Sequence, residues 1–147
     1  MKTQLQLSLA RIAPYIAIST IWEHDPDHYD IRKDCDGFDD ENPNDWQCWQ
    51  SEICATAIVN GDEITGSAYL GGTWEKAGDD PETSNPEISG YELQMTEEAL
   101  QELRESIGDS PILAEQIKTA LAYLKAEMKR SHDEQRAQLA TKDGETL

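Results

Sequence analysis

The 147-residue chain has few basic residues: 12 Lys and Arg stand against 30 Asp and Glu, which gives a formal net charge of −18. Binding to phosphate groups depends on Lys and Arg, so this shortage argues against direct contact with nucleic acid or an anionic membrane. The chain also lacks an apolar run of about 18 residues, so no membrane span is expected. Its N-terminus has no continuous apolar stretch typical of a secretion signal.

Cysteine and catalytic motifs are scarce as well. Three cysteines are too few, and odd in number, for a disulfide framework. We therefore expect the protein to reside in a reducing cytoplasm. The sequence contains no G-x-S-x-G elbow, no P-loop and no dinucleotide-binding fingerprint. Carboxylates are so numerous that finding two together does not indicate a glycosidase mechanism. We therefore expect a protein that is not an enzyme, with no catalytic residues and no cofactor.

The negative charge is concentrated in two segments. Residues 23–45 carry ten acidic side chains, opposed only by Arg32 and Lys33, and a second acidic stretch lies in the Pro-containing segment 79–87. Residues 110–147, in contrast, hold six acidic and six basic side chains. This contrast divides the chain into an acidic α+β domain, residues 1–109, and a charge-balanced C-terminal helix with a frayed tail, residues 110–147.

Alternating hydrophobic residues predict strands in the first half of the chain. Leu5, Leu7 and Leu9 share one parity, and Ile16 and Ile18 share the other, which predicts two short strands separated by a break near Pro14. A hairpin follows, because Asn60-Gly61 is a strong two-residue turn signal between two alternating segments. The apolar face of the hairpin is expected to consist of Trp49, Ile53, Ala55, Ala57 and Val59 on one strand, and of Ile64, Ala68, Leu70 and Trp74 on the other. Gly71-Gly72 indicates a bulge or a close backbone approach.

Helical spacing begins after the second acidic segment. Met95, Ala99, Leu100, Leu103 and Ile107 recur at helical intervals, and Gly108 is a good stop signal. Ser110-Pro111 then begins a second helix, with an apolar stripe at Leu113, Ile117, Leu121, Leu124 and Met128. The expected fold is α+β, an antiparallel meander of three to four strands followed by two C-terminal helices.

Metal binding is one interpretation of the acidic loop, residues 23–45. Its Asp34–Asp39 segment begins like a calcium loop, but the glycine comes at the fourth position and not the sixth, and no flanking helix pair is apparent. Histidines and cysteines also occur nearby, and His24 and His28 have a legitimate zinc-ligand spacing. The cysteines form no Cys-x2-Cys pair, so unpaired thiols are favoured and no metal ligand is assigned.

The acidic loop is also interpreted as a recognition surface. Duplex DNA presents one negative charge per roughly 1.7 Å of axis, and carboxylates on a folded surface present a similar array. Tryptophans flank this loop, and they either fill a thin core or anchor an interface inside a charged rim. The candidate partner-binding residues are Asp25, Asp27, Asp30, Asp34, Asp36, Asp39, Asp40, Glu41, Asp45, Trp46, Trp49, Asp79, Asp80 and Glu82.

A small, strongly acidic chain with strands followed by helices and no catalytic motif resembles the anti-defence proteins of phages and plasmids. These are the anti-restriction and anti-CRISPR inhibitors, several of which imitate DNA. The resemblance rests on the size, charge and strand–helix order of residues 1–109. It implies a stoichiometric inhibitor, acting in the host cytoplasm, that occupies a basic nucleic-acid-binding groove or PAM-reading surface of a host nuclease complex.

Two alternatives remain beside that expectation. The chain is a calcium- or zinc-binding module, or it is a structural or assembly protein of a mobile element, in which the acidic residues maintain solubility. The apolar stripe of the C-terminal helix is longer than one sheet needs, so a homodimer through this helix is a further alternative.

Overall fold

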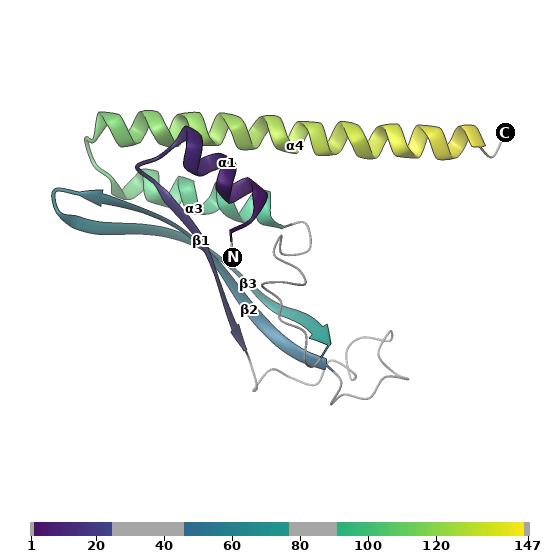
Figure 1. Cartoon of the computed structure of the whole chain (residues 1–147), viewed down its shortest axis with the longest axis horizontal. Coiled ribbons are helices and arrows are strands. Elements are labelled where there is room, and N and C mark those ends of the chain that lie inside the picture. Colours follow the sequence, from purple (N-terminus) through teal and green to yellow (C-terminus); the bar gives the residue numbers. More distant parts are fainter. Residues whose placement is uncertain (1, 25–45, 77–90, 146–147) are drawn as a thin grey trace.

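The computed structural model describes residues 2–24, 46–76 and 91–145, with side chains for 2–23, 49–71 and 91–140. It has the α+β fold expected from the sequence: a short N-terminal helix, a three-stranded antiparallel meander in the order β1-β2-β3, and two C-terminal helices (Figure 1). The elements are α1 (Gln4–Ile12), β1 (Ala17–His24), β2 (Trp46–Val59), β3 (Asp62–Lys76), α3 (Glu92–Ser106) and α4 (Pro111–Glu145). Helices α1 and α3 cover one face of the sheet, and α4 packs across both helices, forming a third layer.

The predicted strand at Leu5–Leu9 is wrong, because these residues lie in α1. The side chain of Thr3 accepts a hydrogen bond from the Gln6 backbone N–H, and the Gln6 side chain accepts one from the Thr3 N–H, which forms a capping box. The buried positions are Gln6, Leu9 and Ala13, which recur at helical spacing. The alternating leucines mislead because Leu7 is exposed and Leu5 is only partly buried.

The predicted hairpin between β2 and β3 is confirmed. Asn60 and Gly61 have positive φ angles of 52° and 84°, as a two-residue turn that follows the twist of the strands requires. The register jumps from Ser51 paired with Leu70 to Trp49 paired with Thr73, so β3 contains the expected bulge at Gly71-Gly72. Beyond the bulge, Trp74 pairs with Cys48 and no longer continues the register predicted from Ile64 and Leu70.

Helix α3 packs very closely on the sheet at Gly66. A Cβ atom added to Gly66 would lie 2.3 Å from the carbonyl oxygen of Ala99 and 2.4 Å from the backbone nitrogen of Leu103. Ala55 pairs with Gly66 across the β2–β3 ladder and is fully buried, and Ala68 is buried two residues along β3. These small residues allow the helix backbone to approach the strand. The core is therefore built around a close contact between α3 and the hairpin.

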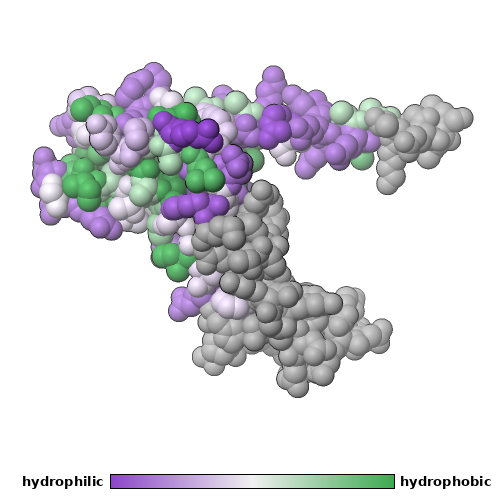
Figure 2. Space-filling model, in the orientation of Figure 1, coloured by the Kyte–Doolittle hydropathy of each residue, from purple (hydrophilic) through white to green (hydrophobic). Residues whose placement is uncertain are grey.

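Helix α4 has two different halves. It begins at Pro111, three residues after Gly108 adopts a φ of 63°, and it buries Leu113, Ile117 and Leu124. Residues 132–140 are all exposed, and this half extends beyond the folded body (Figures 1 and 2). Figure 2 shows that its surface is mainly hydrophilic. This exposed half carries none of the predicted apolar stripe, whose last residue, Met128, is partly buried. In the part of the chain described by the structure, no helix has the length and apolar character that crossing a membrane requires.

The contact at Gly66 predicts the effect of a single methyl group. Gly66→Ala should lower the free energy of unfolding by about 1–3 kcal/mol, because the added Cβ forces two backbones apart. Gly71→Ala is the matched control, since a Cβ at Gly71 has no atom within 4 Å. Urea denaturation of both variants measures the difference. Equal stability of the two variants would contradict the close packing of α3 on β3.

Candidate functional site

All but two of the candidate partner-binding residues lie outside the described residues. These are Asp25, Asp27, Asp30, Asp34, Asp36, Asp39, Asp40, Glu41 and Asp45 in the first acidic segment, and Asp79, Asp80 and Glu82 in the second. The other two, Trp46 and Trp49, lie in β2. Trp46 pairs with Lys76 of β3, and Trp49 pairs with His24 of β1 and is half-buried.

These pairings bring both ends of the first acidic segment and the start of the second to one end of the sheet. The segment 25–45 joins His24 to Trp46, and the segment 77–90 starts after Lys76. His24 ends β1, Trp46 begins β2 and Lys76 ends β3, so all three attachment points lie at the same end (Figure 1). The segments contain nine acidic and two basic residues, and four acidic and no basic residues, respectively. Antiparallel topology thus attaches most of the excess negative charge to one end of the fold. We call this the acidic end.

The tryptophans that flank the first segment have different surroundings. Trp22 of β1 packs against the hydrophobic core, as the core-filling interpretation expects. Trp49 has the same parity along β2 as Ser51 and Ile53, which are buried on the face covered by the helices. The role of Trp49 as an interface anchor stays a prediction.

No helix of the described residues covers the opposite face of the sheet, which was not singled out from the sequence. Two cross-strand rows lie on it: Ser19, Cys54 and Ser67, and, one row closer to the acidic end, Ile21, Glu52 and Tyr69. The exposed fractions of Ile21 and Tyr69 are 52% and 72%. On each strand these positions alternate with the apolar residues of the core face, and this alternation could have identified them from the sequence.

Cys54 is inert on this face. It occupies the central strand between Ser19 and Ser67, so only 8% of it is exposed. Burial raises the pKa of the Cys54 thiol to about 12, and its hydrogen bond to Glu52, with the charge of that carboxylate, adds to the effect. The Sγ atom donates to Oε1 of Glu52 across 3.0 Å. The thiolate, which is the nucleophile and the metal ligand, is therefore rare at neutral pH.

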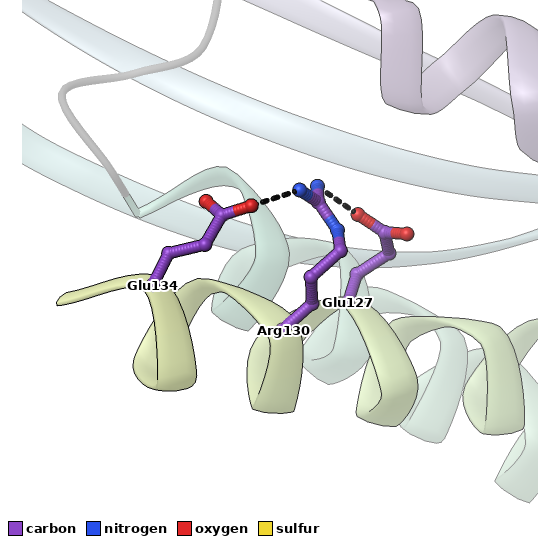
Figure 3. Close-up of polar contacts among 3 residues, drawn as sticks. All are labelled: Glu127, Arg130 and Glu134. Atoms are coloured by element: carbon purple, nitrogen blue, oxygen red, sulfur yellow. Dashed lines mark hydrogen bonds and ion pairs between the residues drawn. The ribbon is translucent and has the colours of Figure 1, made fainter. Parts of the chain in front are cut away.

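A second feature is a polar hollow of about 340 Å³ between α1, α3 and α4. Arg130 lies at its edge and donates to Glu127 and Glu134, each across 2.7 Å (Figure 3). Glu92 is buried and accepts a hydrogen bond from the Thr3 hydroxyl. The Arg130 contacts join residues three and four positions apart on one helix, so they support α4 and do not by themselves indicate a ligand.

The metal interpretation gains no support from the described ranges. Within residues 2–24, 46–76 and 91–145, no three His, Cys, Asp or Glu side chains are grouped so that they could hold a metal ion. His28, Cys35 and Asp34–Asp39 lie outside those ranges. The calcium and zinc hypotheses for the acidic loop thus stay predictions.

Comparison with known proteins identifies no relative of this chain. The chain matches no protein-family model, no curated protein and no solved structure.

The surroundings of Cys54 predict that its thiol reacts slowly and that the reaction rate depends strongly on pH. In a variant with Cys35 and Cys48 replaced by serine, reaction of Cys54 with a disulfide reagent at pH 8 should be at least about 100-fold slower than in the unfolded chain. Because folding raises the pKa to about 12, the rate should keep rising between pH 9 and pH 11. The folded state should also lose stability over that range, since only the unfolded thiol ionises freely there. A rate that levels off near pH 9 would contradict this description.

Proposed function

We propose that this protein is a non-enzymatic inhibitor that binds the basic nucleic-acid-binding surface of a host defence nuclease complex by acidic mimicry of DNA. The observation that carries the proposal is the attachment of both acidic segments to one end of the sheet. Charge that is distributed evenly over a protein promotes solubility, whereas charge on segments attached at one end favours a directed field. A basic groove that binds phosphates would be attracted to this end.

Electrostatics and shape have separate roles in this proposal. In physiological salt, charges are screened beyond about 8 Å, so the acidic end speeds the encounter and orients the chain. Close contacts then determine how long the complex lasts. The partner is a basic nucleic-acid-binding protein or nuclease complex, and no direct contact with nucleic acid or a membrane is involved.

The test is affinity capture from a bacterial host with two variants of equal charge. The first replaces Asp34, Asp36, Asp39 and Asp40 with Asn; the second replaces Glu98, Glu102, Glu105 and Glu115, which are exposed on α3 and α4, with Gln. The wild type and the second variant should retain a nucleic-acid-binding protein that is released by added duplex DNA and by salt. The first variant should capture at least about 10-fold less of that protein, because four negative charges of the first acidic segment have been removed.

Three results would contradict the proposal. The captured protein could resist displacement by DNA, or both variants could lose it equally, which would indicate that only net charge matters. Finally, the chain could capture only copies of itself, which would favour the structural or assembly alternative.

A further inference from the structure

We propose that the helix-free face of the sheet beside the acidic end is a docking surface for arginine side chains of the partner. This inference rests on the proposed function and names the chemistry of the contact. Its centre is the row Ile21, Glu52 and Tyr69, in which adjacent strands pair Ile21 with Glu52 and Glu52 with Tyr69. Directly paired residues have Cβ atoms about 5 Å apart, so Glu52 lies between an aliphatic and an aromatic residue. Its Oε1 accepts the hydrogen bond from the Cys54 thiol.

This row is accessible because the helices lie on the other side. The Gln6 side chain of α1 donates to Thr20, and the α3 backbone lies against Gly66, which places both helices on the opposite face. The neighbouring surface contains a small hollow of about 30 Å³. It is lined by Ile21, Glu23, Gln50, Ser51, Glu52 and Tyr69. A side chain from a partner can therefore reach Glu52 and Tyr69 without rearrangement of the fold.

The charge of the face determines the kind of occupant. Among the strand residues whose side chains the structure describes, the ionisable residues of this parity include Glu23, Glu52 and Glu63, and none of them is Lys or Arg. Lys76, which lies beyond those side chains, pairs with Trp46 of the same parity. A second copy would bring the same acidic side chains and a further net charge of −18, so self-docking through this face is disfavoured. A basic partner surface complements it.

The residue types favour arginine over lysine. A guanidinium group is planar, so it forms two parallel hydrogen bonds to a carboxylate and stacks on an aromatic ring. Tyr69 offers an exposed ring next to Glu52. On the other side of Glu52, Ile21 offers an exposed apolar surface for the aliphatic part of the partner's arginine side chain. Lysine is a compact, strongly hydrated charge and gains less from the ring. Nucleic-acid-binding surfaces are rich in arginine, so the chemistry agrees with the proposed partner.

The test uses two peptides as probes, one with four arginines alternating with serine and one with four lysines alternating with serine. Fluorescence anisotropy should show that the wild-type chain binds the arginine peptide several-fold more tightly. Tyr69→Thr should reduce this preference to about 1, because it removes the stacking surface but leaves the charge unchanged. Tyr15→Thr is the matched control, since Tyr15 is 65% exposed at the end of the sheet remote from the acidic end, and it should leave the preference unchanged.

The outcomes separate this inference from the proposed function. Equal affinities of wild type for both peptides, or a preference that survives Tyr69→Thr, would overturn the docking surface. A dimer that dissociates on Tyr69→Thr, observed by analytical ultracentrifugation, would overturn it in favour of a second copy. The Asp34, Asp36, Asp39 and Asp40 to Asn variant tests the proposed function independently. This variant should bind both peptides more weakly, by the same factor, and should keep the preference for the arginine peptide.

Discussion

The contact between the α3 backbone and Gly66 is the constraint on which the rest of the structure depends. It commits one face of the sheet to the core, because the helix lies too close to the strand for any side chain larger than hydrogen. Once that face is occupied, Ile21, Glu52 and Tyr69 lie on the other. The same packing supports α4, which lies on α3 and α1. A single close contact thus separates a buried face from a face that no described helix covers.

The meander has an equally simple consequence for charge. Because β1, β2 and β3 alternate in direction, the β1–β2 connection and the exit from β3 fall at the same end, opposite the Asn60-Gly61 turn. Both acidic segments are attached there, although they lie far apart in the sequence. Topology therefore sets where the charged segments are attached. The proposed recognition role depends on this common attachment and not on net charge alone.

The sequence predicted the parts of the fold that depend on local signals. The hairpin turn, the bulge at Gly71-Gly72 and the start of α4 at Pro111 follow from residues with restricted backbone preferences. Helix α1 was missed because its leucines alternate, and the capping box of Thr3 and Gln6 was the overlooked signal. The Gly66 contact depends on how α3 docks, which no local pattern specifies. The acidic segments were visible as composition, whereas the row Ile21, Glu52 and Tyr69 requires the pairing of three strands.

The most direct test is hydrogen exchange of the chain, alone and in complex with the basic nucleic-acid-binding protein that we propose as its partner. The account predicts added protection in residues 17–24, 46–54 and 66–76, which form the acidic end and the adjacent open face. It predicts no added protection in residues 132–140 of α4, which extend beyond the body. Protection confined to α4, with unchanged exchange in the three strands, would contradict the account.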